Sequence, residues 1–316
     1  MTLKRAIVTA VAPLRILIDG DTVAVPFTPE SLIDPATLAV DDVVRAELSG
    51  NRLVVLGRAG GLGLLSGRNL FINSNFMVNQ RGAVSGSLIG STAYFLDRWF
   101  NPYGSASLIT WADSGGVRTL TLGDGSGHRY ADQIVEASTL PAGTYTASWE
   151  GTAELYVYAL NPVYADSPVT FTSDGTADVK FQFRGDGETL RNVKLERGSI
   201  PTPFAASPIG EELALCQRYY IRFNSGSLLT VAAYRSTDFW GVLALPVIMR
   251  ANPTLGHSGA GDFAIFANST TLTPSSVALG NFSTFYQELR LNVAGATEGA
   301  GGWVRLSGWI EFDAEL

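Results

Sequence analysis

Cysteine and histidine are almost absent from this sequence of 316 residues, which has one cysteine, Cys216, and two histidines, His128 and His257. A single cysteine excludes a disulfide within the chain, and with only two histidines it also excludes a zinc site built on thiolates. A Ser-His-Asp arrangement needs a histidine held between the nucleophile and the acid. We expect both histidines to be loop or interface residues, and Cys216 to be a small buried hydrophobe on a helix. The sequence therefore predicts neither an enzyme nor a cofactor.

Charge is also scarce, at 16% of residues, and the net charge is −7. A nucleic-acid-binding protein would show a basic footprint, so no nucleic acid partner is expected. No stretch reaches the roughly 18 consecutive apolar residues of a spanning helix, so membrane insertion is not expected either. With 46% hydrophobic residues, the chain has ample material for buried cores.

What the sequence has in quantity is glycine, at 34 residues, with 14 prolines and many threonines, serines, valines and tyrosines. This composition favours short strands joined by tight turns, and the length predicts two or three domains. We predict an all-β protein of three parts, covering residues 1–65, 66–206 and 207–316.

The first part is predicted to be a small β-barrel, OB-like in type. Turns are expected at Asp19–Asp21 and Ser49–Asn51. The glycine-rich run Gly57–Gly63 fails both phosphate-loop patterns and is interpreted as a linker. The strands expected in this part are Ala6–Ala12, Leu14–Ile18, Thr22–Phe27, Val43–Leu48 and Leu53–Leu56.

The second part alternates apolar and polar residues with a period of two, which predicts an antiparallel β-sandwich, a jelly roll of eight or so strands. Trp99 is expected to be a core anchor. Examples of the expected strands are Arg118–Leu122, Gly143–Trp149, Glu154–Leu160, Val169–Thr172 and Val179–Phe183.

The third part opens with a helical pattern at Glu211–Tyr220, where Leu213, Cys216 and Tyr220 form one apolar stripe and acids occupy the first turn. A β-sandwich head is expected after this short helix. Its final strand is predicted to run without interruption over Trp303–Phe312, with Trp303 and Trp309 packed in the core. The other strands expected here are Leu228–Tyr234, Phe239–Leu245, Phe263–Phe266 and Tyr286–Val293.

Several runs of residues resemble those of bacteriophage tail-fibre, or receptor-binding minor tail, proteins. The run NLFINSNFMVNQRG at Asn69–Gly82 and the later YFLDRW at Tyr94–Trp99 resemble the opening of the carbohydrate-binding-module-like domain of such fibres. The run Leu195–Phe204 resembles the closing strand of that domain. Glu211–Tyr220 resembles the helix that follows this domain in such fibres. Leu245–Pro253 and Phe312–Leu316 resemble parts of their C-terminal head.

The resemblance implies an elongated homotrimer in the tail of a virion, with the N-terminal part attached to other tail-tip or baseplate proteins. It also implies adhesion to a polysaccharide or teichoic-type polymer of the host cell surface. Two other functions remain open: a purely structural tail component that displays another adhesin, and a glycan depolymerase. A depolymerase would need two carboxylates facing one groove. The sequence offers many carboxylates but does not show which converge: Asp97, Asp132, Glu150, Glu154, Asp238 and Asp262.

Sugar binding calls for exposed aromatic rings beside polar groups. Tyr156 and Tyr158 share one face of a strand, and if Val157 points to the core they form a platform. Trp111 and Tyr164 are further candidates. In the head, the candidates are Tyr234, Asp238 and Trp240, which lie near a predicted strand turn.

Overall fold

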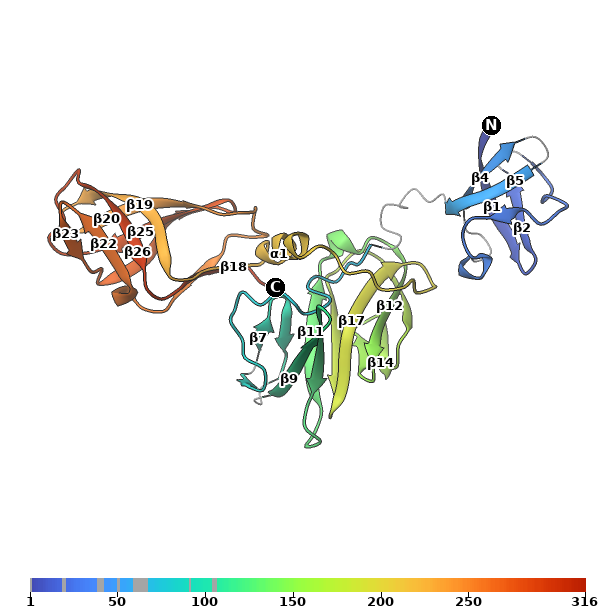
Figure 1. The fold of residues 1–316 in the computed structure, drawn as a ribbon, viewed down its shortest axis with the longest axis horizontal. Coiled ribbons are helices and arrows are strands. Elements are labelled where there is room, and N and C mark those ends of the chain that lie inside the picture. Colours follow the sequence, from blue (N-terminus) through green and yellow to red (C-terminus); the bar gives the residue numbers. More distant parts are fainter. Residues whose placement is uncertain are drawn as a thin grey trace. The chain divides into compact units, whose positions relative to one another are not determined.

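The computed structural model describes residues 2–18, 21–38, 43–49, 52–58, 68–90, 92–103 and 107–316 (Figure 1). Contacts divide the chain into two compact units. The first holds residues 1–69 with Thr144–Thr146 and Leu195–Thr202, and the second holds the remainder up to Leu316. The fold is all-β, as predicted, with one α-helix among the described residues. The expected turns at Asp19–Asp21 and Ser49–Asn51, and most of the Gly57–Gly63 linker, lie outside the described residues.

The N-terminal sheet has five strands in the order β2-β1-β4-β5-β3. Its strands are β1 (Thr2–Val11), β2 (Leu14–Ile18), β3 (Glu30–Ser31), β4 (Val43–Ser49) and β5 (Arg52–Arg58). β3 runs parallel to β5, while β4 pairs antiparallel with both β1 and β5. Alternate aliphatic residues such as Val8, Ile16 and Val55 form its core. This part is all-β, as predicted, and its five strands form one sheet; the OB-like barrel stays a prediction.

The strand predicted at Thr22–Phe27 is wrong. Val23 is 76% exposed and Phe27 is 44% exposed, and the segment forms bends instead. Pro26 and Pro29 remove two backbone donors from this stretch, so a sheet ladder is not available to it.

The central part is a β-sandwich of two six-stranded sheets, in the orders β15-β12-β17-β10-β9-β6 and β14-β13-β16-β11-β8-β7. We call them the first and the second sheet. The strands of the first sheet are β6 (Leu88–Ile89), β9 (Ser107–Ser114), β10 (Val117–Leu122), β12 (Gly143–Gly151), β15 (Val169–Ser173) and β17 (Glu188–Arg197). Those of the second are β7 (Ala93–Leu96), β8 (Trp99–Asn101), β11 (Arg129–Val135), β13 (Glu154–Val157), β14 (Asn161–Ala165) and β16 (Val179–Gly185).

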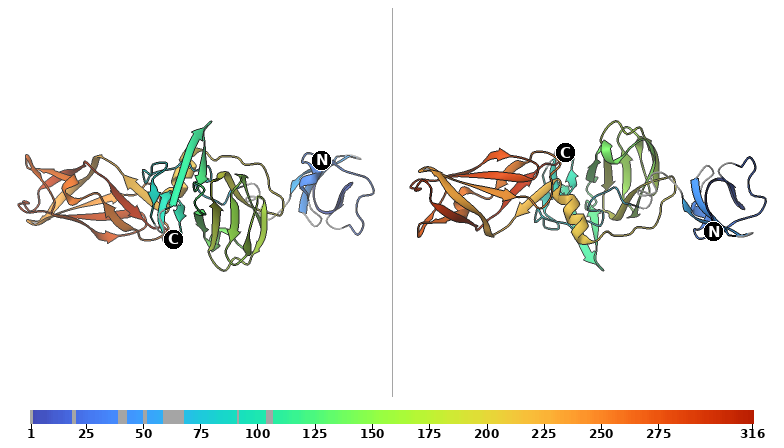
Figure 2. Two further views of the ribbon diagram at one scale, coloured as in Figure 1. Left: turned by 90° about the horizontal axis from the view of Figure 1, so that it is seen from below. Right: turned by 90° about the horizontal axis from the view of Figure 1, so that it is seen from above.

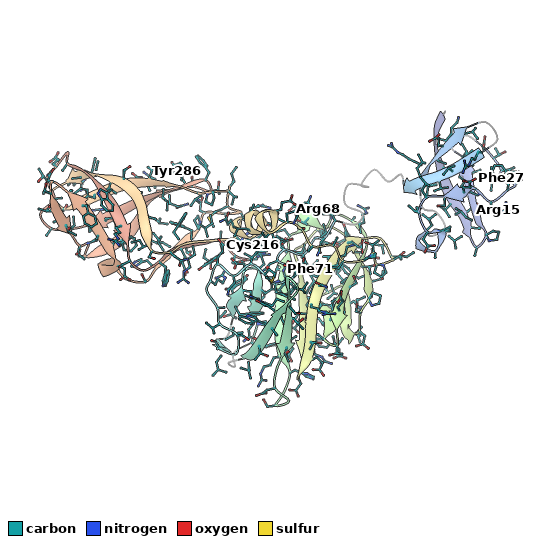
Figure 3. All side chains as sticks on the ribbon, viewed as in Figure 1. Arg15, Phe27, Arg68, Phe71, Cys216 and Tyr286 are labelled. Carbon is teal, nitrogen blue, oxygen red and sulfur yellow. The ribbon has the colours of Figure 1, made fainter. Side chains whose placement is uncertain are left out.

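Aromatic rings fill the space between these sheets. Phe71 lies against Phe181 with ring centroids 5.0 Å apart, and Trp99 lies 4.9 Å from Phe76. Trp99 is fully buried, so the expected core anchor is confirmed. Phe71 comes from the chain that enters the sandwich (Figure 3), so the opening run of this part contributes directly to its core.

The single α-helix, α1, spans Ile209–Gln217, slightly before the predicted range. Cys216 is fully buried in it, as expected. The predicted apolar stripe is wrong in one respect, because Leu213 is only half-buried while Glu212 is 3% exposed. The Glu212 carboxylate accepts a hydrogen bond of 2.6 Å from the backbone amide of Asn73. A buried hydrogen bond from Asn73 to Glu212 therefore holds the helix against the opening loop of the sandwich.

After α1 the chain forms a seven-stranded sheet, ordered β23-β22-β26-β19-β20-β25-β24, and a three-stranded sheet, ordered β18-β27-β21 (Figure 2). Phe239, Phe263 and Phe312 are fully buried in their shared core. The strands are β18 (Tyr220–Phe223), β19 (Gly226–Arg235), β20 (Asp238–Ala244), β21 (Thr254–His257), β22 (Phe263–Ala267), β23 (Thr270–Leu272), β24 (Ser276–Phe282), β25 (Tyr286–Asn292), β26 (Gly301–Leu306) and β27 (Ile310–Asp313).

The predicted continuous strand Trp303–Phe312 is in fact two strands, β26 and β27, in different sheets. Ser307–Trp309 separates them, and the Trp309 amide donates to Ser258 Oγ instead of continuing a ladder. Trp303 is 42% exposed, so its expected place in the core is wrong.

The C-terminal residues bind back onto the sandwich through buried charges. Glu315 forms an ion pair with Arg98, whose side chain is 1% exposed. It forms a second ion pair with Arg81, at 3.1 Å. The ring of Tyr219 lies 3.6 Å from the Arg98 guanidinium carbon. Arg98 also donates to the carbonyl of Ile134 at 2.6 Å.

Replacing Glu315 by alanine should lower the free energy of unfolding of the second unit by about 3–5 kcal/mol, because Arg98 would keep a buried charge without its carboxylate. Urea unfolding followed by tryptophan fluorescence measures this change. Glu298→Ala, which removes an exposed carboxylate, is the matched control and should change stability by less than about 0.5 kcal/mol. Equal losses in the two variants would contradict the importance of the buried pair.

Candidate functional site

The outer face of the second sheet carries a cluster of five tyrosines, which we call the tyrosine face: Tyr103, Tyr130, Tyr156, Tyr158 and Tyr164. Tyr156 and Tyr158 are half-buried, and Val157 between them is fully buried. The predicted orientation of this strand is therefore confirmed, because side chains alternate between the two faces of a sheet.

Strand register brings polar side chains into the middle of this face. Tyr156 of β13 pairs with Gln182 of β16, which pairs in turn with Asp132 of β11, so the three side chains form one row across the sheet. The next row is Glu154, Arg184 and Tyr130. On the opposite face of β16, Phe181 and Phe183 point into the core.

The tyrosine rings contact one another around these rows. Tyr156 lies 4.8 Å from Tyr158 and 5.2 Å from Tyr164, between ring centroids. Tyr103 and Tyr130 form a second pair at 4.4 Å. Tyr103 is the most open of these rings, at 41% exposed. Aromatic contacts of this kind hold the rings in place beyond what burial alone would do.

Gln182 lies at the centre of the tyrosine face and is 1% exposed. Its Oε1 accepts hydrogen bonds from the hydroxyls of Tyr103 at 3.3 Å, Tyr158 at 3.4 Å and Tyr164 at 2.5 Å. Its Nε2 donates to Asp132 Oδ2 at 3.0 Å. Because a carbonyl oxygen has two lone pairs, three converging hydroxyls exceed what it can bind well.

Asp132 lies beneath the rings and is fully buried. Its Oδ1 has no hydrogen-bond partner in the described part of the chain. The nearest cation is Lys180, whose Nζ lies 3.7 Å from Oδ2. Burial raises the pKa of Asp132 to about 8, against the opposing effects of Gln182 and Lys180. At neutral pH the carboxyl group is thus mostly protonated, and it can donate as well as accept.

Two cations flank the tyrosines. The Lys180 ammonium lies 3.7 Å from the centroid of Tyr158, and the Arg184 guanidinium lies 3.6 Å from that of Tyr164. Arg184 is also paired with Glu154 at 2.7 Å. Burial raises the pKa of Tyr164, so its hydroxyl stays protonated and neutral. The face thus combines aromatic surface with hydroxyl, amide and carboxyl groups, the chemistry that binds saccharides.

Trp111 is not part of this cluster. It belongs to β9, in the first sheet, whereas the tyrosine face belongs to the second. The guanidinium of Arg118 lies 5.2 Å from its ring and is paired with Asp113 at 2.7 Å. The structure therefore brings together three of the four aromatic residues predicted for the sandwich, and places Trp111 elsewhere.

The three head candidates do lie together, but Asp238 has a structural role. It is fully buried, and it accepts hydrogen bonds of 3.0 Å from Trp240 Nε1 and from Arg290. Tyr234 is 61% exposed and lies 5.6 Å from Trp240 between ring centroids. Of these candidates, only the two rings remain available for a ligand.

Sequence reasoning missed Tyr103, Tyr130 and Gln182 as members of the site. The alternation Tyr130-Ala131-Asp132 and Lys180-Phe181-Gln182 did signal that polar side chains share one face of two strands. What the sequence did not show is that β11, β16 and β13 are neighbours, because their pairing joins distant segments.

Features of other functional classes are few in the described residues. No three His, Cys, Asp or Glu side chains come together there as metal ligands would. Burial raises the pKa of the Cys216 thiol well above its usual value, which makes it a poor nucleophile. None of the described helices has the length and apolar character to cross a bilayer.

Comparison with known proteins adds little to this geometry. No family model matches the chain, and no curated protein matches it. Among solved structures, one that is similar is a cycloisomaltooligosaccharide glucanotransferase from Paenibacillus sp., complexed with cycloisomaltoheptaose. The match has 10% sequence identity and a TM-score of 0.21, and covers 74% of this chain and 46% of that one. The chain thus spans less than half the length of that enzyme, and a similarity this low carries no argument about function.

The buried carboxyl of Asp132 predicts a pH dependence of stability. Its pKa is about 8 in the folded protein, against 3.8 in the reference state. Between these values the folded protein holds a proton that the unfolded chain gives up, so the free energy of unfolding falls as pH rises. The slope due to this one group is at most about 1.4 kcal/mol per pH unit.

Asp132→Asn keeps the shape of the side chain and removes this proton. Urea unfolding at pH 5, 6 and 7 should therefore show the variant gaining stability relative to the native chain as pH rises. Parallel pH profiles for the two proteins would exclude a raised pKa at Asp132.

Proposed function

We propose that this protein is an adhesion protein of a tailed bacteriophage, a tail-fibre component that binds a glycan of the host cell surface through the tyrosine face. The observation that carries the glycan part is the tyrosine face itself, with five rings grouped around a buried amide and a buried carboxyl. The phage part is supported by the resemblance of the runs Asn69–Gly82 and Glu211–Tyr220 to those of tail fibres. Under this proposal the protein works in the virion, as a homotrimer, with its N-terminal part attached to other tail proteins.

The tyrosine face suits a saccharide better than a protein seam. A seam between subunits is depleted of buried polar groups that lack a hydrogen-bond partner, because burying such a group costs stability. Here Asp132 keeps an unpaired oxygen beneath the rings. A sugar has hydroxyls that can accept hydrogen bonds from tyrosine, while its C–H face stacks on a ring. Weak contacts of this kind gain strength when several chains bind one polymer.

A second candidate function, glycan cleavage, is favoured by one observation. Carboxylates of Glu154, Asp166 and Glu188 line a cavity of about 260 Å³ together with His128, beside the tyrosine face. Two of these groups are already engaged, Glu154 by Arg184 and Glu188 by the backbone amide of Asp186. Release of reducing ends from host polysaccharide, abolished in Glu188→Gln, would favour a depolymerase. Under adhesion, no reducing ends are released.

Adhesion predicts that Tyr156→Ala weakens binding to host cells by about tenfold or more, because the substitution removes a stacking surface from the centre of the site. Tyr156→Phe keeps the ring for stacking and should therefore retain more of the binding than Tyr156→Ala. Labelled protein bound to cells and counted by flow cytometry gives the readout. Leu88→Ala, which alters a residue of the other sheet that is 71% exposed, serves as the matched control.

The same binding measurement is repeated with cells of phage-resistant mutants that lack the receptor. Equal binding to sensitive and resistant cells, or binding to neither, would rule out adhesion. Light scattering after size exclusion should give a mass of three chains, and a monomer at micromolar concentration would exclude the homotrimer.

A further inference from the structure

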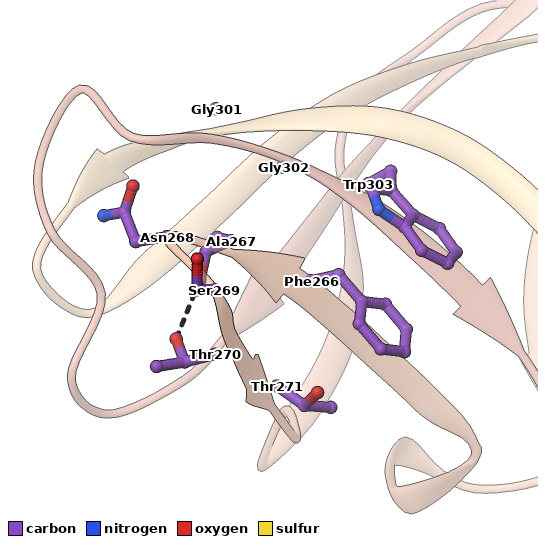
Figure 4. Close-up of a pocket in the computed structure, with 9 residues that line it drawn as sticks. All are labelled: Phe266, Ala267, Asn268, Ser269, Thr270, Thr271, Gly301, Gly302 and Trp303. Atoms are coloured by element: carbon purple, nitrogen blue, oxygen red, sulfur yellow. Dashed lines mark hydrogen bonds between the residues drawn. The ribbon is translucent and has the colours of Figure 1, made fainter.

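The seven-stranded sheet has a hollow on its surface at the turn between β22 and β23 (Figure 4). Its volume is about 400 Å³, which is large enough for a sugar ring. The hollow is bounded by the aromatic residues Phe266 and Trp303 and by the turn Asn268–Ser269. None of the residues that line it is charged: Phe266, Ala267, Asn268, Ser269, Thr270, Thr271, Gly301, Gly302 and Trp303.

Two glycines keep this hollow open. A Cβ atom at Gly302 would lie 2.8 Å from the carbonyl oxygen of Phe266, so only glycine lets β26 approach β22 this closely. Gly301 has no atom within 4 Å of the position of a Cβ. Any side chain at Gly301 would therefore extend into open space beside Trp303. The missing side chain at Gly301 leaves the space beside Trp303 open, whereas Gly302 allows the two strands to approach each other.

The wall of the hollow is a stacked aromatic pair. Phe266 and Trp303 lie on paired positions of neighbouring strands, with ring centroids 4.2 Å apart and planes 11° from parallel. Val304 and Leu306 supply the core side of β26, so Trp303 stands on the outer side and is 42% exposed. Stacking on Phe266 fixes the orientation of the indole before any ligand arrives. Its Nε1 donates to no described residue.

Polar groups at the other side of the hollow are likewise unused within the protein. Asn268 and Ser269 both have positive φ values, 48° and 58°, and form the tight turn between the strands. Neither side chain makes a hydrogen bond to a described residue, and the same holds for Thr271. Thr270 differs, because its hydroxyl donates to the carbonyl of Ala267 at 2.8 Å. The amide of Asn268 and the hydroxyls of Ser269 and Thr271 therefore line the same hollow as Trp303.

We propose that this hollow is a second saccharide site, distinct from the tyrosine face, and that it takes a neutral sugar unit. An exposed indole offers a surface for the C–H face of a pyranose, and the amide and hydroxyls offer partners for its hydroxyl groups. The lining has no side chain of opposite charge to pair with the carboxylate or ammonium group of a charged sugar, so a neutral sugar is favoured. The site rests on the proposed adhesion function and gives the chain two separate contacts with one polymer, which would raise the avidity of a fibre.

The experiment uses the full chain with its six tryptophans labelled as 5-fluorotryptophan and observed by fluorine NMR. Loss of one signal in Trp303→Phe assigns Trp303. The probes are maltohexaose and triacetylchitotriose, which are neutral, chitotriose, which is cationic, and trigalacturonate, which is anionic. We expect the neutral saccharides to shift the Trp303 signal and the charged ones to leave it unchanged. Asn268→Ala should weaken the neutral binding by about fivefold to tenfold, and Phe285→Ala, an exposed residue of the same part, should not.

Two results would overturn the second site. One is an unmoved Trp303 signal with both neutral saccharides up to about 10 mM, well above the range of weak specific binding. The other is a smaller particle mass for Trp303→Ala by light scattering, which would assign the hollow to a seam between copies of the chain.

Tyr156→Ala separates this inference from the proposed function. If Trp303 does not respond while adsorption to host cells still depends on Tyr156, the second site is excluded and adhesion stands. If Trp303 responds but the protein does not distinguish sensitive from resistant cells, adhesion is excluded.

Discussion

The buried guanidinium of Arg98 is the charge on which the arrangement of the second unit depends. It is 1% exposed, so its charge must be matched by groups that other segments bring to it. Glu315 supplies a carboxylate, Tyr219 the face of its ring, and Ile134 a carbonyl. These partners come from the C-terminus, from the residues after α1 and from β11. One charge therefore ties three distant segments together. The neighbouring carboxylate of Asp97 is also matched, because it accepts hydrogen bonds from both the backbone amide and the side chain of Gln80.

Buried polar groups organise the tyrosine face in a similar way but with a different outcome. Around Arg98 the charge is matched by the Glu315 carboxylate, although Arg98 Nε has no partner among the described residues. Around Asp132 the match is incomplete, because one oxygen has no partner and the carboxyl takes up a proton instead. Three hydroxyls compete for Gln182 Oε1 directly above it. Apolar side chains at these positions would avoid the cost of burying polar groups, so packing alone does not require the polar centre.

Alternation of apolar and polar residues predicted most strands and the orientation of Val157, because the side-chain period of a strand depends only on local geometry. It did not predict which strands are neighbours, and so it grouped Trp111 with tyrosines of the other sheet. For Trp303 and Trp309 alternation placed both on one face but did not identify the core side. Arg305 lies on that same face and is exposed, and a charged residue there was the available signal that the face is the outer one. The break at Ser307–Trp309 was signalled by the Ser307-Gly308 pair, which marks a turn, and the Trp309 amide there donates to Ser258.

Asp132 and Asp238 show why a candidate carboxylate cannot be assessed from its sequence neighbours. Asp238 stands among aromatic and polar residues, as a binding residue would, yet both of its oxygens are engaged inside the protein. Asp132 lies within an ordinary strand pattern, yet one of its oxygens is unpaired. The difference lies in how many partners the fold brings to each group, and those partners, Arg290 for one and Gln182 for the other, are about 50 residues away in the sequence. An unmatched buried polar group lowers stability, and Asp132 carries this cost beneath the tyrosines, where burial raises the pKa of its carboxyl group.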